Sequence, residues 1–345
     1  MHIIDKSMAI ALLFITCLSS CGCVGKANEW SFPETVSLFC EERAIDGVYL
    51  KYPFRVRQDD SFLYVMDIHP DGYYGHQFEY PSMKHLQRFV RRGEAPEEFL
   101  GSENIRLHPK NSLWVLDANR MKITGFERED LTQPRQTIAL DERLIRTLDF
   151  DRFDDSTFIV PDYTGLHRLC FVNLRGEVVK RSFGIPFSEN AKDPPIVLAQ
   201  AWRSFLSYNP ANGILAMATQ LGQVLEIYDI QNDSVVHVIH RKGMEPRFMV
   251  KGSYAIPTGI MGYSDIHVGQ EYIYAVFWGH SFDDIKSNKV TKEGGRYIHV
   301  FDLQGKPVRQ YLLDRYITGF SVDEQNKKII ALDVNSDQPV IEYTY

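Results

Sequence analysis

Residues 109–117, PKNSLWVLD, join a polar turn to a short apolar run that ends in aspartate. The unit recurs with its aspartate in DDSFLYVMD (59–67), DDSTFIVPD (154–162) and DEQNKKIIALD (323–333), and without it in NPANGILA (209–216) and GQEYIYA (269–275). A turn followed by β-branched and aromatic residues indicates strands joined in hairpins. The chain therefore carries six diverged, strand-forming repeats.

The spacing of the repeats predicts their architecture. The apolar runs begin near positions 63, 113, 158, 214, 273 and 329, so the repeats are about 45 to 59 residues long, close to propeller blades. A second hairpin follows in FVNLRGE (171–177), YDIQND (228–233) and FDLQGK (301–306). Two hairpins per repeat give four antiparallel strands, which is one blade. We predict an all-β, six-bladed β-propeller of four-stranded antiparallel blades.

The two ends of the chain suggest how the ring closes. The last repeat stops one strand short, while TVSLFC (35–40) forms a spare strand before the first repeat. We predict that this N-terminal strand completes the final blade and closes the ring, which removes an exposed sheet edge. No linker or helical period divides the body, so residues 31–345 are expected to form one domain.

The N-terminus has the features of an export signal. Residues 8–18 are apolar but too short to cross a membrane as a helix, and they match a signal-peptide core. The segment LSSC at 18–21 resembles the bacterial lipobox. We predict a signal peptide over 1–20, lipid attachment at Cys21 and a tether over 21–30, with an ordinary secretory signal as the alternative. The tether lacks an acidic cluster, which favours the periplasmic side over the cell surface.

Composition excludes several function classes. The formal net charge is −7 and basic residues form no stripe, so a nucleic-acid partner is not expected. Cys40 and Cys170 are far apart in sequence, and two free thiols are favoured over a disulfide between them. No metal-binding, nucleophile or nucleotide-binding motif occurs, so no metal, no cofactor and no catalytic residue is predicted.

One segment carries a family resemblance. The stretch FVRRGEAPEEF (89–99) is similar to the inter-blade segment of NHL-repeat propellers, although Ala95 stands where that pattern often has glycine. With YPSMK (80–84) before it and the lipobox upstream, the chain resembles the TolB-like six-bladed propeller lipoproteins of Bacteroides-type bacteria. The resemblance implies an architecture and a place in the cell envelope, and it implies no chemistry.

Propeller topology suggests where a ligand could bind. Loops joining the second and third strands of each blade share a face with the inter-blade crossings. This face is expected to collect aromatic, His and charged side chains from blades one, two, three and five, where Arg120 and the Asp residues 71, 283 and 284 are further candidates. The predicted ligand-binding residues are His69, Tyr73, Tyr74, His76, Tyr163, Trp278 and His280. The alternative is that these side chains only pack between blades or face water.

The preferred function is a non-enzymatic binding or scaffolding module, anchored to the membrane through lipid, for a protein, peptide or glycan. The rival is a hydrolase or lyase acting on glycans or lactones, possibly metal-dependent, because fold alone does not separate the two. A deep central pocket with converging carboxylates and His would favour the enzyme. A shallow rim lined by aromatic residues would favour binding.

Overall fold

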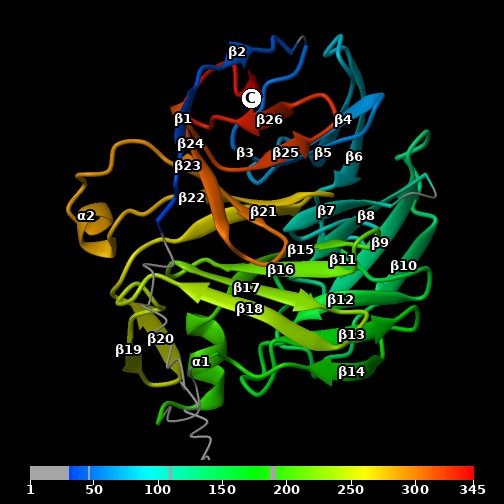
Figure 1. Cartoon of the computed structure of the whole chain (residues 1–345). Coiled ribbons are helices and arrows are strands. Elements are labelled where there is room, and N and C mark those ends of the chain that lie inside the picture. Colours follow the sequence, from blue (N-terminus) through cyan, green and yellow to red (C-terminus); the bar gives the residue numbers. More distant parts are fainter. Residues whose placement is uncertain (1–30, 46, 109–110, 187–191) are drawn as a thin grey trace, which may run out of the picture.

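A computed structural model describes residues 31–45, 47–108, 111–186 and 192–345. Six antiparallel sheets surround a central axis, each with its first strand innermost (Figure 1). The predicted six-bladed β-propeller is confirmed. The predicted signal peptide, Cys21 and the tether lie outside the described residues.

The strands of each blade run outward from the axis in chain order. Blade one contains β3 (Pro53–Gln58), β4 (Phe62–Asp67), β5 (Tyr73–Glu79) and β6 (His85–Arg91). Blade two contains β7 (Asn104–His108), β8 (Ser112–Asp117), β9 (Lys122–Glu127) and β10 (Gln136–Ala139). Blade three contains β11 (Asp151–Arg152), β12 (Thr157–Pro161), β13 (Leu169–Asn173) and β14 (Val178–Ser182).

The second half of the ring follows the same plan. Blade four contains β15 (Ser204–Asn209), β16 (Ile214–Thr219), β17 (Val224–Asp229) and β18 (Ser234–His240). Blade five contains β21 (Tyr263–Val268), β22 (Tyr272–Phe277), β23 (Gly295–Asp302) and β24 (Pro307–Ile317). Blade six contains β25 (Phe320–Asp323), β26 (Lys328–Leu332) and β27 (Val340–Thr344).

The six apolar runs of the sequence are the second strands of the six blades. The strand β8 shows why they are continuous runs rather than alternating patterns, because all six of its residues are buried. A strand with a neighbouring blade on each face buries both rows of side chains. The predicted second hairpins at 171–177, 228–233 and 301–306 join the third and fourth strands.

The aspartate that ends a second strand ties two loops together. The Asp67 carboxylate accepts from the backbone N–H groups of Lys51 at 2.6 Å and His69 at 2.9 Å. Asp117 accepts from the Leu100 N–H at 2.9 Å in the next blade. Each carboxylate therefore fixes an inter-blade crossing against the loop that follows its own strand.

The ring closes differently from the sequence-based prediction. β1 (Thr35–Leu38) pairs in parallel with β24 of blade five, and the two-residue β2 (Glu41–Glu42) pairs with β27 of blade six. The prediction that residues 35–40 complete the final blade is therefore wrong, although an N-terminal strand does close the ring. The eleven residues of β24 leave a long outer edge, and β1 covers part of it.

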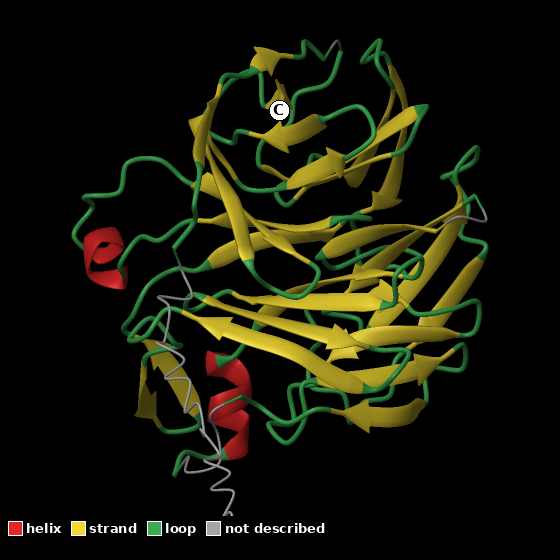
Figure 2. Cartoon of the chain, in the orientation of Figure 1, coloured by secondary structure: helices red, strands yellow, loops and turns green. Residues whose placement is uncertain are grey.

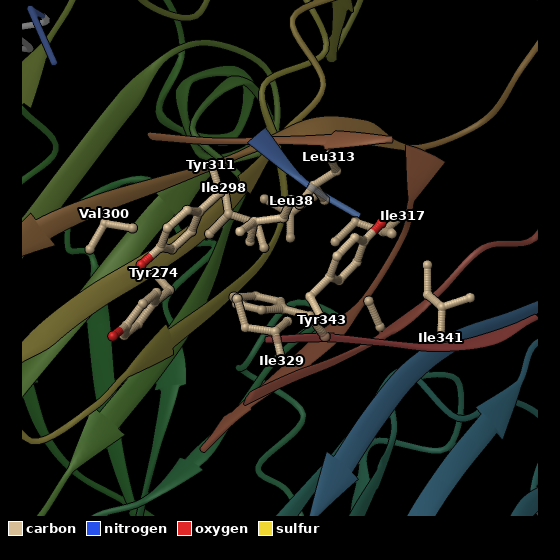
Figure 3. Packing of buried hydrophobic residues seen from close by; sticks show 13 residues of the cluster. Leu38, Tyr274, Ile298, Val300, Tyr311, Leu313, Ile317, Ile329, Ile341 and Tyr343 are labelled. Atoms are coloured by element: carbon tan, nitrogen blue, oxygen red, sulfur yellow. The ribbon is translucent and has the colours of Figure 1, made fainter. Parts of the chain in front are cut away.

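The N-terminal segment also fills the core between blades five and six. Leu38 is 5% exposed and packs in the cluster shown in Figure 3, beside Leu313, Ile317 and Tyr343. Burying a leucine side chain contributes about 1.5–3 kcal/mol. This apolar contact adds to the few backbone hydrogen bonds of β2 in holding the ring shut.

Three inserted segments, two short helices and one hairpin, interrupt the propeller (Figure 2). The helix α1 (Pro195–Ala201) packs against the hairpin of β19 (Phe248–Lys251) and β20 (Tyr254–Pro257), and α2 (Phe282–Lys286) lies in the long excursion of blade five. No helix among the described residues is long and apolar enough to cross a membrane. Cys40 and Cys170 are both free thiols, as expected.

Candidate functional site

Polar side chains alternate along four innermost strands or the residues just before them. Residues two apart on a strand share a face, and on these strands that face is turned to the axis. The pairs are Arg55 and Arg57 at β3, Asn104 and Arg106 at β7, Asp149 and Asp151 at β11, and Asp265 and His267 at β21. On these four strands, the face turned to the axis therefore carries polar and charged side chains rather than apolar ones.

Most of these charges are paired. The Arg57 guanidinium donates to both carboxylate oxygens of Asp265, at 3.0 and 3.1 Å. Arg106 lies 3.0 Å from Asp149 and 3.3 Å from Asp151. Burial opposes ionisation of Asp265, but the attraction of Arg57 outweighs it and holds the Asp265 pKa below its usual value. We call these three ion pairs, made by Arg57 and Arg106, the axial network.

Arg55 differs from its neighbour. Its guanidinium lies between the rings of Phe54 and Phe205, 5.3 and 4.7 Å from their centroids, and one nitrogen donates to the Phe54 carbonyl at 2.9 Å. Among the described residues no carboxylate lies within 4.0 Å of it, and its Nε is buried without a hydrogen-bond partner. Burial lowers the pKa of Arg55, which Asp265 partly opposes from farther away.

Arg55 lines a cavity of about 390 Å³ on the face that carries the inter-blade crossings. We call it the crossing-face cavity. Its apolar wall is formed by Phe54, Ile68, Tyr74, Leu100, Leu148 and Phe205. Its polar wall is formed by Arg55, Ser102, Glu103, Asn119, Arg146, Tyr163, Arg203, Ser204 and Gln220. The volume falls in the usual range for small-ligand sites.

Four buried donors in this wall lack a hydrogen-bond partner among the described residues. They are Arg55 Nε, Ser102 Oγ, Tyr163 OH and Arg203 Nε. Buried polar groups are nearly always satisfied, because an unpaired one costs about 1–3 kcal/mol. All four atoms belong to residues that line one cavity, so its wall contains buried polar groups that the described protein atoms leave unsatisfied.

The charge of the wall is positive. Arg55, Arg146 and Arg203 face one carboxylate, Glu103, whose Oε1 lies 3.9 Å from Arg146. Burial is the main cause that raises the Glu103 pKa, while the backbone N–H of Ala118 partly opposes the shift by donating to the carboxylate at 2.9 Å. The cavity is thus a cationic site in a chain of net charge −7.

Two of the predicted ligand-binding residues line this cavity. Tyr74 is 5% exposed and donates to the Leu100 carbonyl at 3.1 Å. Tyr163 is 7% exposed, and burial raises the pKa of its hydroxyl. Both tyrosines come from blades whose loops were expected to form the ligand face.

The other predicted residues of blade one lie apart from the cavity wall. His69 is exposed, with its ring against Tyr52 at 5.7 Å. Tyr73 lines a different cavity of about 360 Å³ beside β6 and Phe99. His76 lies within β5, 3.4 Å from a ring nitrogen of His85, and burial is the main cause that lowers its pKa to about 4.

The predicted residues of blade five also lie outside the cavity wall. Trp278 and His280 are half-buried, and Trp278 Nε1 and His280 Nε2 have no hydrogen-bond partner among the described residues. The His280 ring stacks on Tyr316 at 6.4 Å. Of the further candidates, Asp71 pairs with Lys51, Arg120 donates to the carbonyls of Glu94 and Ala95, and Asp283 and Asp284 lie in the first turn of α2.

Sequence analysis missed the charged residues of the cavity. The signal that could have found Arg55 is the alternation Arg-Val-Arg just before the first apolar run, since it places two cations on one face of an innermost strand. Arg146 and Arg203 lie in crossings, where no periodicity marks them. Within the described part of the chain, no group of three or more His, Cys, Asp or Glu residues is arranged to hold a metal ion.

The fold and site define a six-bladed propeller with one cationic cavity over blades one to four. Residues 31–325 match the family described as TolB-like 6-blade propeller-like, and the chain belongs to that family. A comparison with curated proteins gives no match.

Solved structures share the fold at low identity. A DUF4221 family member from Bacteroides vulgatus has a TM-score of 0.57 at 12% identity, covering 89% of this chain and 95% of the other. A putative exported protein from Bacteroides fragilis has 0.54 at 8%, covering 90% and 98%. The β-propeller domain of Cps50 (Swd1) from Myceliophteria thermophila has 0.51 at 9%, covering 89% and 99%.

Proposed function

We propose that this protein is a lipid-anchored binding protein of the bacterial cell envelope, and that its ligand is held in the crossing-face cavity. The observation that carries the proposal is the convergence of four unpartnered buried donors on one cavity of about 390 Å³. A ligand with acceptor oxygens is suited to the guanidinium, hydroxyl and amide groups of this wall, and the aromatic and aliphatic wall contributes apolar contact. Ligands of this size include a glycan end or a short peptide segment.

The anchor is supported by the leader rather than by the propeller. An apolar run followed by Leu18-Ser19-Ser20-Cys21 matches the pattern that precedes lipid attachment. The Bacteroides fragilis neighbour carries the description of an exported protein, which agrees with this assignment. Replacing Cys21 with Ser is expected to move the protein from the membrane fraction to the soluble fraction, and mass spectrometry of the mature N-terminus would identify the lipid.

Binding fits the cavity better than hydrolysis does. Glycoside hydrolases ordinarily use two carboxylates that flank the bond to be cleaved. Glu103 is the one carboxylate among the described residues that line the cavity. The donors around it are suited to holding an oxygen-rich ligand in place.

The proposal is tested by closing the cavity. Leu100 is 46% exposed and lines the cavity, so Leu100→Trp adds bulk there without disturbing a packed core. Purified residues 24–345 would be screened for ligand-induced thermal shifts with glycans, envelope peptides and divalent metals. A ligand that binds the native state raises the melting temperature, and Leu100→Trp is expected to abolish that rise.

The matched control is Leu86→Trp. Leu86 is 41% exposed on the outermost strand of blade one, away from the cavity. It is expected to leave the thermal shift unchanged. A ligand that binds Leu100→Trp as tightly as the unmodified protein would place binding elsewhere and refute the proposed site.

A further inference from the structure

We propose that the crossing-face cavity recognises a carboxylate group on its ligand, with Arg55 and Arg203 donating to the carboxylate oxygens. This inference rests on the proposed function and names the chemical class of its ligand. It applies to a carboxylate of either source, an acidic sugar or the C-terminus of a peptide.

Arg55 is buried without a carboxylate partner among the described residues. Burying a cation costs free energy unless the cation is paired with an anion. Arg57, two residues later, is paired through a bidentate contact to the Asp265 carboxylate. Arg55 has only a carbonyl contact and two flanking rings. The rings of Phe54 and Phe205 hold the guanidinium in place, so little side-chain entropy is lost when it binds an anion.

Arg203 supplies a second guanidinium to the wall of the same cavity. It precedes β15 of blade four and stands two residues before Phe205, whose ring contacts Arg55. Arg203 is half-buried, its Nε is buried without a partner, and no carboxylate lies within 4.0 Å of it among the described residues. Two arginines from opposite blades therefore line one cavity, and neither has a carboxylate partner among the described residues. Guanidinium donors match the planar geometry of a carboxylate.

A carboxylate suits the charge of this wall better than a more highly charged anion does. Glu103 stands in the same wall and would repel a dianion such as a phosphate monoester more strongly than a carboxylate. Tyr74, Leu148 and Phe205 add apolar surface beside the arginines. The wall is therefore complementary to one negative charge on a partly apolar molecule.

The experiment compares two probes with their neutral counterparts by titration calorimetry. One pair is methyl glucuronide and its methyl ester, and the other is N-acetyl-Ala-Tyr as free acid and as amide. Charge-assisted hydrogen bonds predict that at least one acid binds roughly 10-fold to 100-fold tighter than its neutral form. Which pair shows this preference tells whether the ligand is a sugar or a peptide.

The variants assign the preference to the cavity. Arg203→Gln is expected to remove most of the preference for the acid while leaving binding of the neutral form unchanged. Arg55→Lys keeps the charge but loses the planar pair of donors, so it is expected to weaken acid binding about 10-fold. The control Arg175→Gln removes an exposed arginine from a turn on the opposite face and is expected to change neither affinity.

Two outcomes overturn the carboxylate inference. One is equal binding of acid and neutral probes, or an acid affinity that Arg203→Gln leaves unchanged. The other is the absence of binding by either acid at millimolar concentration. The proposed function fails separately, if Leu100→Trp leaves the thermal shifts of the wider panel intact.

Discussion

Arg55 and Arg57 lie two residues apart on β3, on the same face and close to the same axis, yet their surroundings differ. Arg57 donates to two oxygens of Asp265, to its own neighbour's carbonyl and to the Phe320 carbonyl. Arg55 meets one carbonyl and two aromatic rings. The fold therefore pairs the Arg57 guanidinium with a carboxylate, whereas Arg55 lines a cavity without such a partner.

The same contrast separates two regions of the propeller centre. In the axial network, Arg106 reaches Asp149, Asp151 and the Leu206 carbonyl, so the charges of several blades are joined. In the crossing-face cavity, donors from blades one, two, three and four have no protein partner among the described residues. We infer a structural role for the axial network and ligand recognition for the crossing-face cavity.

The largest effect is expected from breaking the axial network. Asp265→Ala would leave Arg57 buried without its carboxylate, and breaking one side of a buried pair costs about 3–5 kcal/mol. Urea unfolding followed by circular dichroism measures this loss directly.

A double variant controls for the loss of the pair itself. Arg57→Met combined with Asp265→Leu removes both charges, and replacing a whole buried pair with apolar residues is often close to neutral. The double variant is therefore expected to regain most of the lost stability. A double variant as unstable as Asp265→Ala would contradict the structural role given to this pair.

A smaller change in stability but a clear loss of binding is expected from Arg55→Met. Methionine keeps an unbranched side chain between Phe54 and Phe205, and the ion pair of Arg57 remains. The free energy of unfolding is expected to change by about 1 kcal/mol or less, since no paired charge is left behind. Acid-probe binding is expected to weaken by about 1.5–3 kcal/mol, the usual worth of hydrogen bonds to charged groups.

If Arg55→Met and Asp265→Ala lost equal stability, the claim that Arg57 has a structural role and Arg55 does not would be wrong. Urea unfolding and calorimetry on the same protein samples provide both readings. The informative result is the pattern across the two variants, because either variant alone could lower binding through general unfolding.

The sequence predicted the fold well because its signals were local. Each second strand is buried on both faces, so a continuous apolar run after a turn identifies it without knowledge of its neighbours. Ring closure was predicted less well. Whether 35–38 pairs with blade five or blade six depends on the length of β24, which only the folded edge reveals.

The site was harder to predict for the same reason. Tyr74 and Tyr163 were both expected in loops on the face of the cavity. Tyr163 lies in such a loop, whereas Tyr74 lies in β5 and still lines the cavity. Arg55 lies in β3 and Arg203 lies in the crossing before β15, on opposite sides of the ring, so their placement at one cavity depends on how six blades pack. No spacing in the sequence predicts that these two segments lie near each other. In the structure, the contact of the Phe205 ring with Arg55 shows it.

The smallest effect concerns Glu103, the carboxylate beside the unpaired arginines. Burial, with Asp117 adding to it, raises the Glu103 pKa, so this group binds its proton at higher pH than an exposed glutamate does. As the pH falls from about 7 to about 5, Glu103 begins to lose its charge while the carboxylate of the probe, with a pKa below about 4, stays ionised. Repulsion then weakens, and acid-probe affinity is expected to rise.

Replacing Glu103 with a neutral residue is expected to raise acid-probe affinity for the same reason. Glu103→Gln keeps an oxygen to accept from the Ala118 N–H and removes the repulsion at every pH. At neutral pH it is expected to tighten acid binding about fivefold, roughly 1 kcal/mol, and to flatten the pH dependence. Neutral probes should respond to neither change. A variant that instead weakens acid binding would mean that Glu103 contacts the ligand, and the cavity would then recognise a donor as well as an acceptor.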